Sequence, residues 1–142
     1  MIVNGVLYGE DQQVAEFVRN LVGLKGRWET CSALGVVKDG ELLGGVVFHD
    51  YRPAADDMEL SAAFTSPKWC SARTLTQMLR YPMLQLRLKR ATARTAESNW
   101  IARDFLERLG FEQEGCLRRA YDGQQDMILY GCLRDQFFWR KV

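Results

Sequence analysis

A helical spacing of apolar residues marks the first element that the sequence predicts. Apolar side chains three and four positions apart share one side of a helix, so residues 11 to 22, which begin with the acidic Asp11, are predicted to form an amphipathic helix. Gly23 is expected to end it. The residues of its apolar side are Val14, Phe17, Val18, Leu21 and Val22.

Two runs of β-forming residues follow, on either side of the tetrapeptide Lys38-Asp39-Gly40-Glu41. An Asp-Gly pair supplies the positive φ angles of a tight turn, so we predict a β-hairpin here. From Met58 to Thr65, apolar residues alternate with polar or small ones, which is the spacing of a strand. Pro67 has no amide hydrogen to donate, so this third strand is predicted to end before it.

The region after Pro67 predicts a helix and then a strand. Leu75, Met78 and Leu79 fit a helix that begins near Ser71, and Pro82 is expected to bend or break it. The run KRATARTAE, residues 89–97, is predicted to be a strand. The order strand, helix, strand indicates a right-handed crossover between two parallel neighbours.

A last helix and two more strands complete the predicted fold. Residues 99 to 109 carry apolar side chains at helical spacing, and Gly110 supplies a left-handed stop. The runs FEQEGCLRRAY and DMILYGCLRDQF, joined around DGQQ, are predicted to pair as antiparallel strands. The sum is an α/β fold (α+β by some schemes) with a mixed sheet and helices on both faces, in a single domain spanning residues 1–142.

Composition agrees with one globular domain and argues against several function classes. The 142 residues are 47% apolar and 26% charged, with a formal net charge of +1. Such a chain can bury a continuous core, and its balanced charge argues against disorder and against a field that binds polyanions. The sequence begins without a signal-type segment and contains no long apolar run, so a cytoplasmic protein is expected, with no membrane partner.

The cysteines and the single histidine make a poor metal-binding set. Cys31, Cys70, Cys116 and Cys132 show no C-x-x-C spacing, and His49 is the one histidine of the chain. We therefore expect no metal and interpret the cysteines as reduced, mostly buried thiols, with a disulfide pair as the alternative. His49 is expected to have a local structural partner, and a place in an acceptor pocket is the alternative.

A longer motif in the C-terminal third resembles a known family. The pattern N-x-x-A-x-x-F-L-E-R-L-G-F-x-x-E-G runs from Asn99 to Gly115 and continues as LRRAY-DGQQD-MILYGCLRD. This ordered string resembles the GNAT N-acetyltransferase superfamily, nearest its ribosomal-protein N-terminal acetyltransferase (Rim-type) branch. The likeness covers residues 31 to 135 in the order of elements and is tight from Thr92 to Arg134. It implies a mostly antiparallel sheet of six or seven strands with a splayed central parallel pair.

The resemblance also implies a place for acetyl-coenzyme A, between the strands Met58–Thr65 and Arg90–Thr95. Backbone groups of the first strand would hydrogen-bond the pantetheine arm as if it were an added strand. Asn99 would offer an amide donor and acceptor to the same arm or to the wall of the cleft. The alternative is that Asn99 only caps its helix, which is a common role for asparagine. The positions expected to contact the cofactor on the first strand are Ala62, Ala63, Phe64 and Thr65.

The phosphate-binding loop departs from the family pattern. The family has Gln/Arg-x-x-Gly-x-Gly/Ala before the helix, whereas this chain has SPKWCSARTLTQM, without a glycine. A helix start still offers free N–H groups and a positive dipole end to an anion. The alternative is a helix start that is merely capped by Ser71, with its basic side chains in solvent. The candidate phosphate-binding residues are Cys70, Ser71, Ala72, Arg73 and Thr74, with Lys68 adding charge.

Acetyl transfer to an amine requires that a proton be removed, because amines have pKa values of roughly 8 to 10.4. Glu59 is the candidate base, since it interrupts an apolar strand where a carboxylate needs partners or water. Its position also resembles that of the glutamate which removes the proton through a water in several GNAT enzymes. A solvent-exposed or salt-bridged glutamate is the alternative, and Asp56 and Asp57 are substitutes. The amide hydrogen of Phe64 is expected to polarise the thioester oxygen.

Many GNAT enzymes place a tyrosine that acts as general acid where this chain has Leu106. A coenzyme A thiolate has an ordinary thiol pKa of about 8.5, so it can leave without much help. Tyr121 and Tyr130 are candidate replacements, and a buried tyrosine bonded to the backbone is the alternative. No Cys/His pair indicates a nucleophile, so direct transfer without an acyl-enzyme is expected.

The expected function is acetyl-coenzyme A-dependent acetylation of a primary amine, at a protein N-terminus or on a small molecule. One alternative is a noncatalytic binding module on the same scaffold with weakened cofactor binding. A third is a nucleic-acid adaptor, which is disfavoured because acidic residues balance the basic ones; no nucleic acid is expected as a partner. The apolar tail QFFWRKV is expected to pack on another element or on a second subunit of a homodimer.

Overall fold

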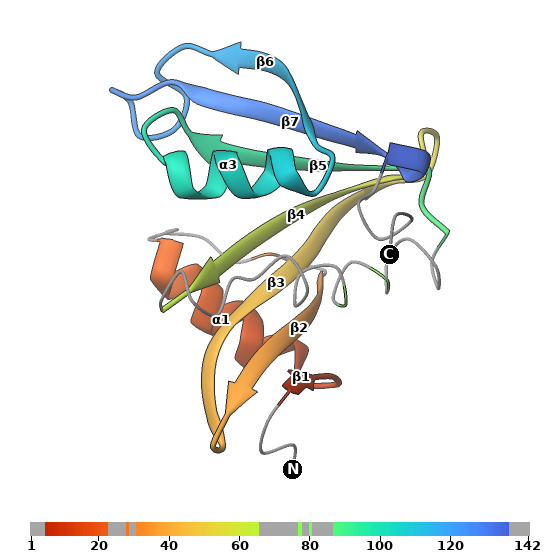
Figure 1. Ribbon diagram of the computed structural model, residues 1–142, viewed down its shortest axis with the longest axis vertical. Helices are drawn as coiled ribbons and strands as arrows, with labels where there is room; N and C mark the ends of the chain where they lie inside the picture. Colours follow the sequence, from red (N-terminus) through yellow and green to blue (C-terminus); the bar gives the residue numbers. More distant parts are fainter. Residues whose placement is uncertain are drawn as a thin grey trace.

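Among the residues that the structure describes, one seven-stranded sheet has helices on both faces (Figure 1). The computed structural model describes residues 5–22, 28, 31–65, 77, 80 and 87–136. Its helical elements are α1 (Asp11–Val22), α3 (Trp100–Arg108) and the 3-10 turn η3 (Arg134–Gln136). Its strands are β1 (Gly5–Leu7), β2 (Cys31–Lys38), β3 (Glu41–Arg52), β4 (Asp57–Phe64), β5 (Arg90–Ala96), β6 (Glu112–Leu117) and β7 (Met127–Leu133).

The strands lie in the order β1-β2-β3-β4-β5-β7-β6. Every neighbouring pair is antiparallel except β4 and β5, which run parallel at the centre. The predicted hairpin, the strand before Pro67, its parallel neighbour and the C-terminal antiparallel pair are therefore confirmed. β1 was missed, because three residues are too few to show an alternating pattern. Of the helix predicted to begin near Ser71 and to bend at Pro82, the structure describes only Gln77 and Arg80, and both are helical.

The turn between β2 and β3 has the backbone that its sequence predicts. Asp39 and Gly40 have φ angles of 52° and 78°. Two consecutive positive φ angles give the turn a twist that matches the twist of the paired strands. Lys38 and Glu41 consequently pair directly across the turn, which fixes the register of the hairpin.

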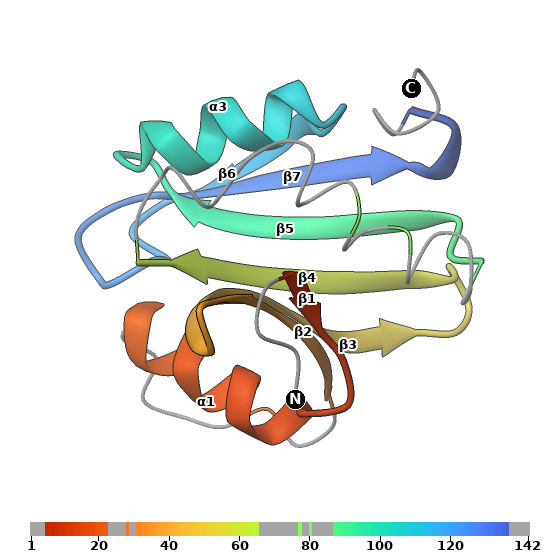
Figure 2. The same cartoon turned by 60° about the horizontal axis from the view of Figure 1, so that its bottom comes forward.

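Helix α1 packs on one face of the sheet, beside β2 and β3 (Figure 2). Val14 and Val18 are fully buried and lie in one cluster with Ala33. Asp11 begins the helix, and its Oδ1 accepts the amide hydrogen of Ala33 at 3.0 Å. The predicted helix is confirmed over its whole length. Its predicted apolar side is wrong in one place, because Leu21 is 45% exposed.

The approach of α1 to β3 depends on the glycine at position 45. A Cβ atom built on Gly45 would overlap Val14 Cγ1 and would lie 3.0 Å from the carbonyl oxygen of Leu34. The helix reaches the sheet at this point because no side chain stands between them.

Helix α3 belongs to the opposite face. Leu106 and Leu109 join the main core together with Tyr130 of β7. Along β3, Val46 belongs to this core while its neighbour Val47 packs with α1, since successive side chains of a strand point to opposite faces. The prediction of helices on both faces is confirmed.

The two ends of α3 are fixed in different ways. At the N-terminus, Asn99 Oδ1 accepts the amide hydrogen of Ala102 at 3.1 Å. After the C-terminus, Gly110 has a φ of 101°, and a Cβ there would overlap the carbonyl oxygen of Gln136 in η3. The Leu-Gly-Phe stop therefore ties the end of the helix to the turn that follows β7, because only glycine leaves room for this contact.

The described cysteines are free thiols in three different environments. Cys132 is buried, Cys31 is half-buried and Cys116 is exposed. The prediction of mostly buried thiols is therefore wrong for the described cysteines, and Cys70 lies outside the described residues. Burial raises the pKa of Cys132 to about 12, because a thiolate would be poorly solvated there.

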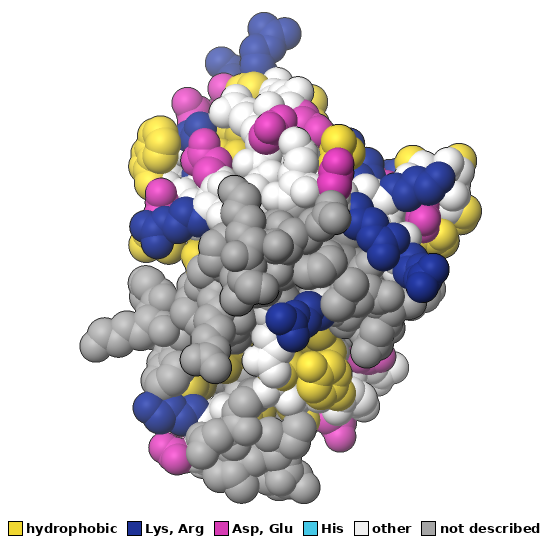
Figure 3. Space-filling model, turned by 45° about the vertical axis from the view of Figure 1, so that its right-hand side comes forward, with side chains coloured by type: hydrophobic (Ala, Val, Ile, Leu, Met, Phe, Trp, Pro, Cys, Tyr) yellow, Lys and Arg dark blue, Asp and Glu magenta, His cyan; other side chains and the backbone are white. Residues whose placement is uncertain are grey.

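Basic and acidic side chains are interspersed on the surface. In the described part of the face drawn in Figure 3, arginines and lysines lie among aspartates and glutamates rather than apart from them. This mixture agrees with the net charge of +1 and gives no support to a nucleic-acid adaptor. Within the described part of the chain, no helix has the length and apolar character needed to cross a membrane.

Gly45→Ala should destabilise the protein, because its Cβ would overlap Val14 and press on the backbone of Leu34. We expect the free energy of unfolding to fall by about 1–3 kcal/mol, as for other overpacked cores, measured by urea denaturation. Gly115→Ala is the matched control, since the nearest atom to its Cβ would be Leu129 Cδ1 at an ordinary 3.5 Å. Equal stability of the two variants would contradict the close helix approach.

Candidate functional site

The parallel strands β4 and β5 stop pairing halfway along their length. The paired positions are Asp57–Leu60 on β4 and Arg90–Ala93 on β5. β4 continues to Phe64 and stays paired with β3, while β5 continues to Ala96 and stays paired with β7. Figure 1 shows the two ribbons diverging beyond this point. The splayed central pair that the family resemblance implied is therefore present.

Backbone groups of β4 beyond this point face β5 without a strand partner. The amide hydrogen of Thr65 is donated to the carbonyl oxygen of Leu43, on the β3 side, at 2.8 Å. Successive residues of a strand direct their N–H and C=O groups to alternate sides, so Ala63 also faces β3, whereas Ala62 and Phe64 face β5. Of the four predicted backbone contacts, two are thus directed toward the space between the strands and two are used within the sheet.

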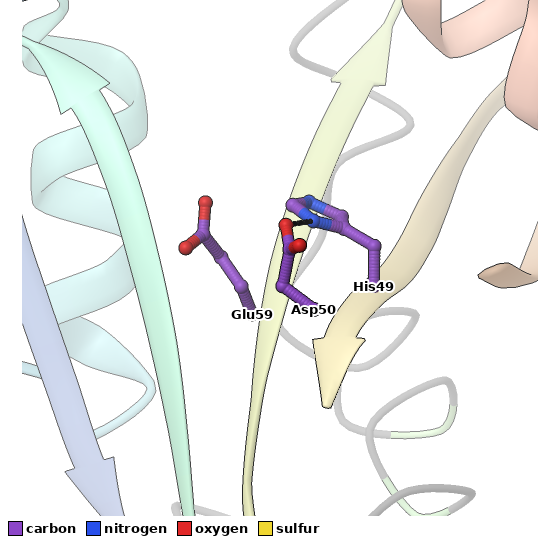
Figure 4. A group of neighbouring side chains, drawn as sticks. All are labelled: His49, Asp50 and Glu59. Atoms are coloured by element: carbon purple, nitrogen blue, oxygen red, sulfur yellow. Dashed lines mark hydrogen bonds and ion pairs between the residues drawn. The ribbon is translucent and has the colours of Figure 1, made fainter. Parts of the chain in front are cut away.

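Glu59 lies on the face of the sheet on which α1 packs, and it is 8% exposed. Its Oε1 accepts a hydrogen bond from Arg94 Nε at 3.0 Å and lies 3.5 Å from Arg52 Nη2. Figure 4 shows its carboxylate in the space between β4 and β5. The alternative of a salt-bridged glutamate is therefore observed. No described residue donates a hydrogen bond to Oε2.

The two aspartates considered as substitutes for Glu59 have their own partners. Asp57 accepts hydrogen bonds from Arg52 Nη1 and from Thr92 Oγ1, both at 3.0 Å. Asp56 Oδ1 accepts a hydrogen bond from the Tyr51 hydroxyl at 3.1 Å, which raises the pKa of Tyr51. Glu59 consequently keeps more hydrogen-bonding capacity than Asp57, whose carboxylate oxygens both have partners.

A third arginine extends this network toward the edge of the sheet. Arg90 Nη2 donates to Glu114 Oε1 at 2.7 Å, and Arg90 Nε lies 3.4 Å from Asp57 Oδ1. The hydrogen bond with Glu114, followed by the nearby charges, raises the pKa of Arg90. Guanidinium and carboxylate groups thus alternate across β3, β4, β5 and β6, and the two buried carboxylates of the described residues, Asp57 and Glu59, each have a cationic partner.

His49 has the local partner that was expected, but sequence reasoning did not identify it. The imidazole is 4% exposed, with Nδ1 2.6 Å from Asp50 Oδ2 and Nε2 2.8 Å from Ser61 Oγ. The ring of Trp28 stacks on it with centroids 5.1 Å apart. Ser61 lies 12 positions further along the chain, so only the register of β3 and β4 reveals the contact.

His49, Asp50 and Glu59 bring potential metal-ligand atoms within 4.8 Å of one another. Imidazole and carboxylate groups do bind divalent cations. Here, however, both imidazole nitrogens are hydrogen-bonded, and Arg52 and Arg94 already neutralise Glu59. A divalent cation would meet two guanidinium groups, so the electrostatics of this cluster oppose it.

Asn99 is the helix cap that the alternative interpretation predicted. Its side-chain oxygen is used by Ala102, whereas its amide group donates to no described residue. Capping uses the side-chain oxygen, whereas the predicted ligand contact can use the side-chain nitrogen, so Asn99 can fill both roles. The candidate phosphate-binding residues Lys68 and 70–74 lie outside the described residues.

The residues considered in connection with a general acid are mostly structural. Leu106 is buried in the main core. Tyr130 is fully buried, and its hydroxyl oxygen accepts a hydrogen bond from Arg103 Nε at 3.1 Å, so its partner is a side chain rather than the backbone. This bond raises the pKa of Arg103. Tyr121 is 44% exposed.

Solved structures share this fold, although no family model and no curated protein matches the sequence. A mutant form of the spermidine/spermine N-acetyltransferase SpeG from Vibrio cholerae matches with a TM-score of 0.78 and 18% identity, over 96% of this chain and 98% of its own. A second SpeG mutant from the same organism matches with a TM-score of 0.70 and 19% identity, over 94% of this chain and 82% of its own. A protein described as a probable acetyltransferase matches with a TM-score of 0.66 and 22% identity, over 77% of this chain and 64% of its own length. The chain has the GNAT acetyltransferase fold.

Asn99→Asp should separate helix capping from ligand binding. Aspartate keeps the oxygen that accepts the Ala102 amide hydrogen, so stability should change by less than about 0.5 kcal/mol, whereas Asn99→Ala should lose about 1 kcal/mol. Both values come from urea denaturation. If the Asn99 amide also contacts acetyl-coenzyme A, Asn99→Asp should bind it more weakly in calorimetry. Unchanged affinity would leave Asn99 with the capping role alone.

Proposed function

We propose that this protein is an acetyl-coenzyme A-dependent N-acetyltransferase that moves an acetyl group directly to a primary amine. The separation of β4 and β5 carries this proposal, because it opens an unpaired strand edge in a fold otherwise seen in acetyltransferases. An extended pantetheine arm can hydrogen-bond such an edge as an added strand does. Ala62 and Phe64 supply the backbone groups for it.

The side chains along the unpaired edge of β4 are small enough to admit the pantetheine arm. The side chains at positions 62 and 63 are both alanine, so they leave room for an arm that approaches the β4 backbone. The Phe64 amide hydrogen, directed toward β5, can donate to the thioester oxygen and stabilise the charge that develops there. The diphosphate would be held by the N–H groups of residues 70–74 together with Lys68.

Glu59 is proposed to accept the amine proton through a water. Its Oε2 accepts no hydrogen bond from a described residue, and its carboxylate lies beside the strands β4 and β5 that would hold the thioester. Arg94 and Arg52 fix the carboxylate and keep its charge tolerable in a buried position. Without a tyrosine at position 106, the thiolate leaves unassisted, as its pKa of about 8.5 permits.

The acceptor is proposed to be a protein N-terminus or a small-molecule amine. The motif from Asn99 to Gly115 resembles the Rim-type branch and favours a protein N-terminus. Vibrio cholerae SpeG is named for spermidine and spermine, which are small polyamines. Both acceptors present a primary amine, so the same proton transfer to Glu59 serves either.

Acetyl-coenzyme A should raise the melting temperature. Ligand at 100 times its dissociation constant adds about 2.7 kcal/mol to the stability of the folded state. Ala62→Pro is the matched variant, because proline removes the N–H directed toward β5 and leaves the ladder with β3 in place. It should fold but show a smaller shift. No shift of the wild type at millimolar ligand would favour a noncatalytic binding module on this scaffold.

Glu59→Gln should slow amine acetylation by about 10²–10⁴-fold, because a positioned general base typically contributes that much. Glutamine can still accept the hydrogen bond from Arg94, so the variant should fold and retain the acetyl-coenzyme A shift. Glu41→Gln, an exposed position at the hairpin, provides the same change of charge as a control. An unchanged rate in Glu59→Gln, measured with an amine that the wild type acetylates, would exclude Glu59 as the essential base.

A further inference from the structure

We propose that Ser61, His49 and Asp50 form a second catalytic centre, a hydroxyl–imidazole–carboxylate triad that hydrolyses small activated acyl esters and thioesters. This activity goes beyond amine acetylation and does not require coenzyme A. It is inferred from the contacts of the three side chains and from the place of Ser61 in the sheet.

The hydrogen bonds run in the order that a nucleophilic serine requires. Asp50 Oδ2 lies 2.6 Å from His49 Nδ1, and His49 Nε2 lies 2.8 Å from Ser61 Oγ. A carboxylate can only accept, so Nδ1 carries the proton and Nε2 of the neutral ring is left as the acceptor for the Ser61 hydroxyl hydrogen. The imidazole is thus oriented as a base toward Ser61.

The backbone of Asp50 is distorted in a way that makes this arrangement possible. Consecutive side chains of a regular strand point to opposite faces, so Asp50 would ordinarily point away from the ring of His49. Asp50 instead has a φ of 53°, and the register of β3 against β4 shifts between His49 and Arg52. Figure 4 shows the carboxylate and the imidazole facing each other as a result. Such strain is typical of functional sites.

The imidazole is restrained through its ring face as well as through its two nitrogens. Trp28 stacks on His49 at an interplanar angle of 29°, which restricts rotation of the ring. Glu59 is the cross-strand neighbour of His49 on β4, and its carboxylate has Arg94 and Arg52 as partners. The orientation of the imidazole is therefore fixed by the stacked ring and by the hydrogen bonds to both nitrogens.

Ser61 lies where β4 leaves its pairing with β5. It is the first residue of β4 beyond the last pair with β5, and it is only half-buried. The following residue, Ala62, directs its N–H toward β5. An N–H immediately after a nucleophile is well placed to stabilise the oxyanion of a tetrahedral intermediate.

The chemistry balances without a further reactant except water. Ser61 Oγ bonds to the acyl carbon while its proton passes to His49 Nε2, and the bond from that carbon to the alcohol or thiol breaks as the leaving group takes the same proton. Water then attacks the seryl ester, and its proton passes to His49. Ser61 Oγ leaves with that proton, and the carboxylic acid is released.

The test uses p-nitrophenyl acetate and the full chain, without coenzyme A. After an acid quench, intact mass and peptide mapping should find one acetyl group on the peptide that contains Ser61, with release of p-nitrophenolate. Ser61→Ala should abolish both the acetylation of this peptide and the release of p-nitrophenolate. Ser32→Ala, a strand serine outside the triad, should keep wild-type rates. His49→Gln should slow acylation by about 10²–10⁴-fold.

Three results would overturn the triad. One is the absence of acetyl-Ser61 in wild-type protein whose unfolding transition shows that it is folded. Another is an equal ester-cleavage rate in Ser61→Ala. The third is activity that EDTA removes and zinc restores, which would assign His49, Asp50 and Glu59 to a metal. Should Ser61→Ala fail to fold, Ser61→Cys retains a nucleophile and should form a thioester at the same position.

The outcome is independent of the proposed acetyltransferase activity. Acetylation of Ser61 by the ester in a protein that does not bind acetyl-coenzyme A supports the triad and contradicts the first function. The converse result is that amine acetylation persists in Ser61→Ala while the wild type never acquires acetyl-Ser61. That result supports the acetyltransferase and contradicts the triad.

Discussion

The short parallel contact between β4 and β5 is the constraint on which the rest of the structure depends. It joins the two strands only over Asp57–Leu60 and Arg90–Ala93. Each strand remains paired on its outer side to its end, so opening the inner side leaves few backbone groups without partners. Those few groups, on Ala62 and Phe64, are the ones that a ligand can use.

The two faces of the sheet divide stability and chemistry between them. On the α3 side, Phe48, Leu60, Ala93 and Tyr130 form an apolar core that runs continuously across β3, β4, β5 and β7. On the α1 side, the corresponding part of the sheet carries paired charges and the His49 cluster. Apolar contacts can hold the strands together on one face while polar side chains remain available on the other.

Much of this fold could be predicted from local patterns in the sequence, because local chemistry decides it. The Asp39-Gly40 turn, the spacing of Val14 and Val18, and the glycine at position 110 each indicate one backbone conformation whatever the rest of the chain does. β1 is too short to leave such a signal. The parallel pair was inferred from the order of elements.

The site was less accessible to this reasoning, since it depends on register. Glu59 was identified as a carboxylate in need of a partner, but its partner Arg94 lies 35 positions away on a neighbouring strand. Ser61 and Asp50 meet His49 through the pairing of β3 with β4 and through a positive φ angle, neither of which the sequence specifies. Asn99 shows the opposite case, because both of its expected roles followed from its place at a helix start.

The brevity of the β4–β5 contact has a consequence for how the protein reaches its native state. The meander β2–β3–β4 and the unit β5–α3–β6–β7 are each built from neighbours in sequence, whereas the contact between them must first close the long chain segment that separates Phe64 from Arg90. The two halves can therefore gain structure early and dock late. Amide hydrogens along the seam should exchange through partial openings that leave both halves intact, so the most loosely held part of the sheet coincides with the region proposed to bind ligand.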